Sequence, residues 1–202
     1  MNESTNKRIV VGISGASGAV YARRVIELLV QAEVEVHLIV SPFGQRLLHD
    51  ELGMEGLDRP ALANQPAGSE PPTNLIVHNY RDVGALPASG SFQHDGMIVV
   101  PCSSNTLGAI AHGSGQNLMH RAAHVALKER RRLVLVHRET PLSLIDIRNM
   151  HTVTEVGAIV APASPGFYLL PESIDELVDF VAGRCLDLLH VPHPLEVRWE
   201  RA

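Results

Sequence analysis

The sequence has few of the features that mark specialised classes of protein. Its 202 residues contain only two cysteines, Cys102 and Cys185, so a disulfide framework is excluded and a reducing, cytoplasmic environment is expected. No apolar run approaches the length of a membrane span, and the polar N-terminus is not typical of a secretion signal. The formal charge of -5 argues against a nucleic-acid partner held by bulk charge. Eleven histidines occur without a zinc-binding spacing, so no metal site is expected.

A glycine-rich segment joins a predicted strand to a predicted helix near the N-terminus. Residues 8–13 form a short β-branched run, typical of a strand that is buried on both faces. Gly12, Gly15 and Gly18 recur at a spacing of three, and a helical pattern of apolar residues begins at Ala19. Glycines in such a turn let backbone N–H groups approach a phosphate, and the helix N-terminus adds its positive dipole. This spacing differs from the dinucleotide-binding fingerprint, so by itself it indicates either a phosphate loop or a tight turn.

Strands and helices alternate along the rest of the chain. This order predicts a three-layer Rossmann-like (flavodoxin-like) α/β fold, with a parallel sheet and helices on both faces. No repeat or second domain is visible, so 1–202 is expected to be one domain with a disordered N-terminus (1–7) and a C-terminal tail (191–202). Further strands are predicted at 34–40, 75–78, 97–100, 133–136 and 158–160, further helices at 42–52, 104–110, 117–130, 142–153 and 174–189, and loops at 53–72 and 82–91.

Small polar residues follow four of the predicted strands. In a doubly wound sheet, ligands bind beyond the carboxyl ends of the strands, where these loops gather. The loops at 14–18, 41, 101–106 and 138–141 supply hydroxyls, backbone amides, one arginine and one glutamate. Any single hydroxyl could simply cap a helix, as Ser41 before Pro42 and Ser103 are placed to do. Together the loops predict a hydrogen-bonding nucleotide pocket without an obvious nucleophile, and Cys102 is expected to be a small packed residue.

Five segments resemble the UbiX-type flavin prenyltransferases, which belong to the superfamily of homo-oligomeric flavin-containing cysteine decarboxylases. The resemblance runs from about Arg8 to Leu189, and the pair Arg198 and Trp199 resembles the family's C-terminal tail. L-K-E-R-R followed closely by R-E-T-P-L is highly specific for this family. The matching segments are G-I-S-G-A-S-G-A (12–19), P-C-S-S-N-T-L (101–107), R-A-A-H-V-A-L-K-E-R-R (121–131), R-E-T-P-L (138–142) and P-G-F-Y with P-x-S (165–173).

This resemblance implies a reaction and an assembly. The dimethylallyl group of dimethylallyl phosphate is transferred to reduced FMN, with bonds formed at flavin N5 and C6. The product, prenylated FMN, is the cofactor of UbiD-type decarboxylases, which would receive it. The flavoprotein subunits are expected to form a homododecamer, with no metal, nucleic acid or membrane as a partner.

The resemblance also implies the residues of the site, and the implied roles are chemically coherent. Without a metal, a leaving phosphate needs fixed cations and hydrogen-bond donors. Glu51 would reach a flavin site across a subunit interface. FMN would be held by Gly15, Ala16, Ser17, Ser41, Ser103, Ser104, Asn105, Thr106 and Arg138. Dimethylallyl phosphate would be held by Lys128, Tyr168, Arg184 and Arg121, and the catalytic residues would be Glu139, Ser17, Glu51 and Lys128.

Plain structural explanations exist for three of these residues. Lys128 could complement the dipole of a helix C-terminus, Arg184 could form a surface ion pair, and Tyr168 could be a core aromatic residue. Departures from the family pattern concern the flavin contacts and the length of the prenyl donor; they are Pro42, Val83, Asn105, Gln116 and His124.

Two other functions remain open from the sequence. An FMN-dependent decarboxylase of the cysteine-decarboxylase type would carry a P-x-M-N-x-x-M-W segment, which residues 141–146 do not match. A non-catalytic FMN carrier would need no allylic phosphate site, so the set of Lys128, Glu139, Tyr168 and Arg184 argues against it.

Overall fold

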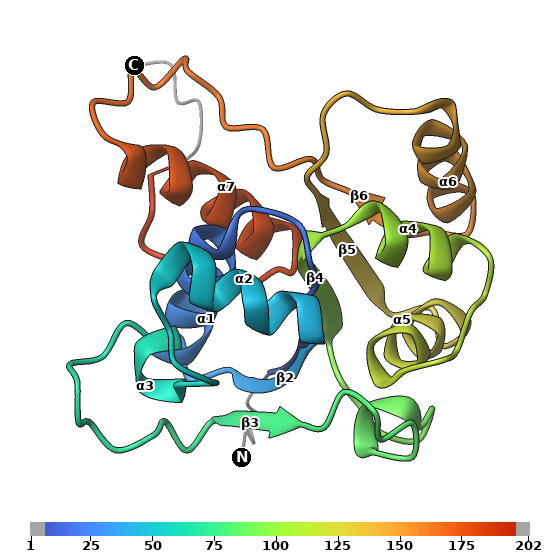
Figure 1. Ribbon diagram of the computed structural model, residues 1–202, viewed down its shortest axis with the longest axis horizontal. Helices are drawn as coiled ribbons and strands as arrows, with labels where there is room; N and C mark the ends of the chain where they lie inside the picture. Colours follow the sequence, from blue (N-terminus) through green and yellow to red (C-terminus); the bar gives the residue numbers. More distant parts are fainter. Residues whose placement is uncertain (1–6, 197–202) are drawn as a thin grey trace, which may run out of the picture.

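Six parallel strands form the centre of the molecule (Figure 1). The computed structural model describes residues 7–196, and its strands are ordered β3-β2-β1-β4-β5-β6. This order places a topological switch point between β1 and β4, where ligands bind in sheets of this type. The strands are β1 (Arg8–Ile13), β2 (Glu35–Val40), β3 (Leu75–His78), β4 (Gly96–Cys102), β5 (Arg132–His137) and β6 (Ile159–Val160).

Helices cover both faces of this sheet, so the predicted three-layer α/β architecture is confirmed (Figure 1). On one face, apolar residues of four helices join the core: α1 (Ala19–Gln31), α2 (Pro42–Leu52), α3 (Arg59–Leu62) and α7 (Ile174–Leu188). The opposite face is covered by α4 (Ser104–Ala111), α5 (Leu118–Lys128) and α6 (Leu144–Glu155). The short 3₁₀ helix η1 (Leu86–Ala88) lies in the loop predicted at 82–91.

The alternation of side chains along β1 explains why its run of apolar residues is continuous. Ile9, Val11 and Ile13 belong to the core under α1 and α7, whereas Val10 belongs to the core under α4 and α5. All four side chains are fully buried, as the sequence predicts for a strand covered on both faces. The sheet therefore holds its carboxyl-end loops on a rigid base.

Polar side chains begin most of the helices. Ser41 and Ser103 cap α2 and α4, as predicted, by accepting hydrogen bonds from the backbone N–H groups of Gly44 and Thr106. The helix predicted from residue 142 begins two residues later at Leu144. The reason is a capping box, in which Ser143 and Asp146 satisfy each other's backbone N–H groups.

Differences from the other predicted boundaries are small. The helix predicted at 117–130 spans Leu118–Lys128, because Asn117 is its N-cap. The surface excursion at 53–72 contains the short helix α3. Residues 1–6 of the predicted disordered N-terminus, and residues 197–202 of the tail with Arg198 and Trp199, lie outside the described residues. The assignment of 1–202 to one domain stays a prediction.

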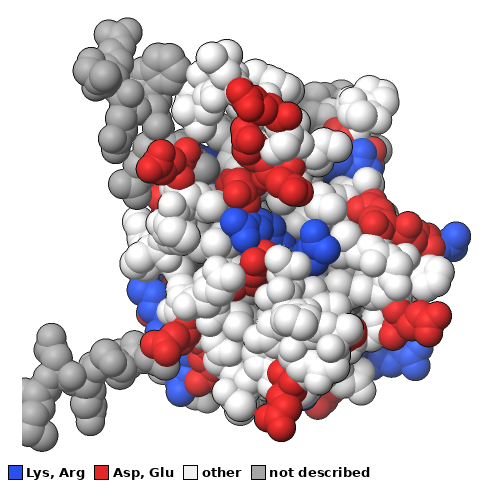
Figure 2. All heavy atoms as spheres, turned by 90° about the vertical axis from the view of Figure 1, so that its left-hand side faces the viewer, with Lys and Arg blue, Asp and Glu red and all other residues white. Residues whose placement is uncertain are grey.

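Ion pairs tie α1 to α7 on one side of the molecule. The Arg24 guanidinium binds both carboxylate oxygens of Asp179 at 2.6 and 3.2 Å, and it pairs with Glu27 at 2.9 Å. Figure 2 shows that acidic and basic side chains are interspersed on this side. Within residues 7–196, none of the helices has the length and apolar character needed to cross a bilayer.

Candidate functional site

A buried serine joins the two strands at the switch point. The Ser14 hydroxyl, 1% exposed, donates to the carbonyl of Pro101 at 2.8 Å and accepts from the backbone N–H of Ser103 at 2.8 Å. The loop after β1 and the loop after β4 are therefore fixed to each other. Ser14 is thus a buried link between the two loops of the predicted pocket, whereas Gly15 and Ser17 in the same loop are exposed.

The hydroxyls of Ser41 and Ser103 cap helices and lie directly after the carboxyl ends of β2 and β4. The Ser41 oxygen accepts from Gly44 N–H at 2.9 Å, and the Ser103 oxygen accepts from Thr106 N–H at 3.3 Å. Gly44 is required for this packing, because a Cβ there would lie 2.4 Å from the carbonyl oxygen of Ile13. Both capped helices thus point their N-termini, which are favourable for anions, toward the carboxyl ends of the strands.

Glu51 occupies the start of α1 within the same chain. Its carboxylate accepts from the backbone N–H groups of Gly18, at 3.0 Å, and Ala19, at 2.8 Å. Helix α1 has no side-chain cap of its own, and its N-cap Gly18 has φ of 123°, a conformation that favours glycine. Glu51 therefore reaches back from α2 and places negative charge on the positive end of α1.

Arg138 and Glu139 follow β5, beside the loop after β4. The backbone N–H of Arg138 donates to the carbonyl of Cys102 at 3.3 Å. The Arg138 Nε is buried and has no hydrogen-bond partner within residues 7–196. Glu139 Oε1 accepts from Thr140 N–H at 3.0 Å, and its Oε2 lies 3.5 Å from the Ser104 hydroxyl. A buried, unpaired guanidinium nitrogen calls for an acceptor such as a phosphate or a carbonyl.

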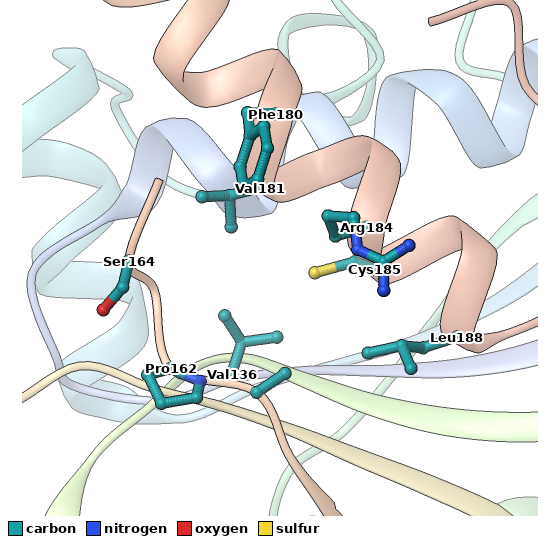
Figure 3. Close-up of a pocket in the computed structure, with 9 residues that line it drawn as sticks. Val136, Pro162, Ser164, Phe180, Val181, Arg184, Cys185 and Leu188 are labelled. Atoms are coloured by element: carbon teal, nitrogen blue, oxygen red, sulfur yellow. The ribbon is translucent and has the colours of Figure 1, made fainter. Parts of the chain in front are cut away.

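A cavity of about 220 Å³ lies between α7 and the loop after β6. Figure 3 shows Phe180, Arg184 and Leu188 of α7 on one side of it, with Val136 and Ser164 on the other. The Arg184 guanidinium is half-exposed and also pairs with Asp187 at 2.9 Å. The Tyr168 ring meets the Phe180 ring edge-on, with 5.6 Å between centroids. The structure thus brings Tyr168 and Arg184 to the same side of α7.

Two predicted residues lie on α5, and one of them is far from the rest of the site. Lys128 ends α5, four residues before β5 begins, so it lies at the amino edge of the sheet. It is largely exposed and pairs with Glu129 at 3.1 Å. Because Arg138 follows the other end of β5, the length of that strand separates the two by roughly 20 Å. Arg121, in the first turn of α5, is exposed.

Two buried polar residues at the site were missed by the sequence analysis. Asp146, which is 8% exposed, accepts from the backbone N–H of Ser143 at 2.9 Å and from the Ser143 hydroxyl at 2.5 Å, and these hydrogen bonds lower the pKa of its carboxyl to about 2. His137 is 3% exposed; its Nδ1 bonds to the carbonyl of Cys102 at 2.9 Å, and its Nε2 has no partner in the described chain. The S-x-x-D pattern at 143–146 could have identified Asp146 as a capping residue. No sequence signal singled out His137.

The cysteine beside the site is not a nucleophile. Cys102 is fully buried, and burial raises the pKa of its thiol to about 12, so a thiolate does not form at neutral pH. The expectation of a small packed residue is confirmed. In the part of the chain that the structure describes, no group of three His, Cys, Asp or Glu side chains is arranged to hold a metal ion.

Comparison with known proteins identifies the family. The profile of the Flavoprotein family matches residues 1–186. The Flavin prenyltransferase UbiX of Alkalihalophilus pseudofirmus is 42% identical over 199 residues, which cover 98% of this chain and 99% of the relative. The chain belongs to the UbiX family of flavin prenyltransferases.

Two solved structures, one of a UbiX protein and one of a UbiX-like protein, share the fold of this UbiX-family chain over nearly its full length. The crystal structure of AnUbiX in complex with FMN and dimethylallyl pyrophosphate superposes with a TM-score of 0.86 at 43% identity, covering 98% of this chain and 99% of that one. A dodecameric FMN-dependent UbiX-like decarboxylase from Escherichia coli O157:H7 has a TM-score of 0.86 at 38% identity, covering 96% and 100%. The family membership inferred from the motifs is therefore confirmed.

Proposed function

We propose that this protein is a flavin prenyltransferase that joins the dimethylallyl group of dimethylallyl phosphate to N5 and C6 of reduced FMN. The observation that carries the proposal is the near full-length similarity to UbiX enzymes, together with AnUbiX, which binds FMN and dimethylallyl pyrophosphate. The buried Arg138 Nε has no hydrogen-bond partner within residues 7–196, which supports a ligand with an anionic or carbonyl oxygen at the carboxyl end of β5.

The loops after β1, β2, β4 and β5 would hold FMN. Their backbone N–H groups and hydroxyls surround the N-termini of α2 and α4, and Arg138 adds a fixed positive charge. Glycine at position 15 allows the loop after β1 to pack closely against α2, because a Cβ there would lie 2.4 Å from the Cβ of Phe43. The proposed FMN-binding residues are Gly15, Ala16, Ser17, Ser41, Ser103, Ser104, Asn105, Thr106 and Arg138.

The α7 cavity would hold the allylic phosphate. Cleavage of the allylic C–O bond places negative charge on the phosphate, and the Arg184 guanidinium and the Tyr168 hydroxyl supply fixed donors for it. Arg121 and Lys128 are proposed to contribute further positive charge, so that the reaction needs no metal. Lys128 of the same chain lies at the far edge of the sheet, which supports contribution of this residue by a second copy of the chain.

Glu139 is proposed to accept the proton that leaves the flavin ring when the second bond closes. The carboxylate is exposed at the end of β5, beside the proposed flavin site, and it can act as a general base there. Ser17 is exposed on the loop after β1, and Glu51 fixes the start of α1 below it. We assign catalytic roles to both residues, together with Lys128.

Assembly and delivery complete the proposal. A homododecamer is supported by the dodecameric E. coli neighbour and by the separation of Lys128 from the other site residues. The product, prenylated FMN, would pass to a UbiD-type decarboxylase. We further propose that the protein works in the cytoplasm without a nucleic-acid or membrane partner.

Phosphate release tests the proposed reaction. Under anaerobic conditions, inorganic phosphate should appear from dimethylallyl phosphate only when reduced FMN is present, and oxidised FMN provides the matched control. Phosphate release that is independent of the flavin's redox state would contradict the proposal. The alternative, an FMN-dependent decarboxylase, is not favoured, since three relatives that are 42–43% identical to this chain are named Flavin prenyltransferase UbiX, whereas the E. coli neighbour named a UbiX-like decarboxylase is 38% identical.

A further inference from the structure

The C-terminal end of α5 is tied to the loop that leads into β4. The chain reverses at Arg130, whose φ of 57° lies in the left-handed region. The backbone N–H of Arg131 then donates to the carbonyl of Ala126 at 2.8 Å, as in a Schellman ending. After this reversal, the two terminal nitrogens of Arg131 donate to the carbonyls of Gly90 and Phe92 at 2.7 and 2.5 Å. The helix end and the loop therefore form one unit.

Residues 89–92 of this loop make a tight turn, which we call the Gly90 turn. The backbone N–H of Phe92 donates to the carbonyl of Ser89 across it at 3.2 Å. The Phe92 ring packs against the core under α4 and α5, and it meets the His37 ring edge-on with 4.7 Å between centroids. Arg131 and the Phe92 ring thus anchor the turn beside α5 (Figure 1).

An ion pair lies directly over Gly90. A Cβ at this position would lie 2.5 Å from Glu129 Oε1 and 3.1 Å from Lys128 Nζ, closer than van der Waals contact. The two charged groups bind each other at 3.1 Å. Adjacent residues within a helix do not face each other, so this pairing occurs because α5 ends at Lys128, with Glu129 as its C-cap. The Gly90 turn therefore provides the surface against which the Lys128 ammonium lies.

Two plain explanations account for only part of this arrangement. A lysine at a helix C-terminus complements the helix dipole, and an exposed ion pair adds little to stability. Neither explanation requires a glycine below the pair or an arginine that holds the glycine's carbonyl. The Lys128 ammonium has three N–H donors, so two remain after one binds Glu129. The pair thus leaves the ammonium able to bind a phosphate.

We propose that the Gly90 turn is a positioning element, which together with Glu129 fixes the Lys128 ammonium where it binds the allylic phosphate held by a second copy of the chain. A lysine side chain samples many rotamers, and fixing it before the substrate binds removes this entropic cost from the binding step. Arg131 contributes by holding the turn against α5. This inference rests on the proposed function of Lys128.

A double-mutant cycle between Gly90 and Lys128 tests the positioning role. The readout is the affinity for dimethylallyl phosphate of the protein loaded with oxidised FMN, measured by isothermal titration calorimetry, so that no turnover is needed. Gly90→Ala is expected to weaken this affinity about tenfold, because the added methyl group displaces the ammonium. In the Lys128→Met background the same substitution should change the affinity by less than about twofold. The affinity for FMN should stay the same throughout.

Gly84→Ala is the matched control, because Gly84 belongs to the same loop. A Cβ there would lie 3.4 Å from Asp82 Oδ1, which is an ordinary contact. Neither Gly84 nor Gly90 has a φ in the left-handed region, so alanine strains the backbone at neither position. Moreover, the atoms that a methyl group at position 90 would meet are the ends of flexible side chains, so Gly90→Ala should still fold. Gly84→Ala should bind dimethylallyl phosphate like the wild type.

Arg131→Lys is a second variant that tests the same element. It keeps the positive charge, but an ammonium does not reproduce the fork of the guanidinium that binds two carbonyls. We expect it to weaken the affinity for dimethylallyl phosphate about threefold, and this effect should be absent in the Lys128→Met background. Size-exclusion chromatography checks that each variant keeps the assembly of the wild type.

Separate outcomes distinguish failure of this inference from failure of the proposed function. Coupling between Gly90 and Lys128 in the affinity for dimethylallyl phosphate, without prenyl transfer by the wild type, would keep the positioning role and reject the reaction. Equal effects of Gly90→Ala in both backgrounds would overturn the positioning role, as would an unchanged affinity in Gly90→Ala. Prenyl transfer by the wild type alongside either of these results would keep the proposed reaction and reject the positioning role alone.

Discussion

Substitution of Ser14 by alanine should destabilise the protein more than the loss of a single oxygen atom suggests. The hydroxyl is buried and makes two hydrogen bonds of 2.8 Å, one to the carbonyl of Pro101 and one from the N–H of Ser103. In Ser14→Ala, the Pro101 carbonyl still accepts the hydrogen bond from the backbone N–H of residue 14, at 3.2 Å. The N–H of Ser103 loses this partner, and the methyl group leaves no polar atom in its place.

The expected destabilisation follows from these two bonds. A buried hydrogen bond contributes about 1 kcal/mol, and a buried donor left unpaired costs about 1–3 kcal/mol. We therefore expect Ser14→Ala to lower the free energy of unfolding by about 3 kcal/mol. For a chain of this length, that corresponds to a fall in Tm of about 6–12 °C. Affinity for FMN should fall as well, because Ser103 begins α4 at the proposed flavin site.

Thermal unfolding at a fixed protein concentration measures this effect, since assembly makes Tm depend on concentration. Ser173→Ala is the control, because Ser173 caps α7 at an exposed position by accepting from Glu176 N–H at 3.2 Å. Loss of that cap should cost about 1 kcal/mol or less. A Tm of Ser14→Ala equal to that of Ser173→Ala would refute the role of Ser14 as a buried link between the loops after β1 and β4.

Three further predictions concern the site. Arg184→Ala and Tyr168→Phe should still bind FMN, as measured by fluorescence quenching, but should lose prenyl transfer. The rate should fall by about a hundredfold or more in Arg184→Ala. Loss of FMN binding in either variant would show that these residues belong to the flavin site and not to the phosphate site. Glu139→Gln should slow closure of the second bond more than formation of the first, so a singly bonded flavin adduct should accumulate in quenched samples, and its absence would count against Glu139 as the base. The pKa of Asp146 is lowered to about 2 from 3.8, so its contribution to stability is present above about pH 4 and is lost as the pH falls toward 2. The free energy of unfolding of Asp146→Asn should therefore approach that of the wild type as the pH falls over this range. A difference in free energy that stays constant with pH would argue against the lowered pKa.

The sequence predicted the fold because local signals and burial agree in most elements. The β-branched run at 8–13 and the capping residues Ser41 and Ser103 lie where the periodicity indicates. Predicted boundaries were wrong where a side-chain hydrogen bond sets the end of an element. The start of α6 depends on the reciprocal bonds between Ser143 and Asp146, which outweigh the helical preference of Leu142.

The site was predicted less completely than the fold. Residues in the loops after β1, β4 and β5 were identified because parallel strands bring their carboxyl ends to one edge. The contacts of Glu51 with α1 and of Ser104 with Glu139 join residues distant in sequence, and no periodic pattern encodes them. The placement of Lys128 far from Arg138 became apparent only from the strand order and the direction of α5.

The mass of the flavin after turnover tests the central claim most directly. The protein is incubated anaerobically with FMN, a reductant and dimethylallyl phosphate, and the released flavin is analysed by mass spectrometry. The proposed reaction predicts a gain of one five-carbon prenyl unit, which should be absent with Arg184→Ala. Unchanged FMN from a wild-type protein that still binds the flavin would contradict the assignment as a flavin prenyltransferase.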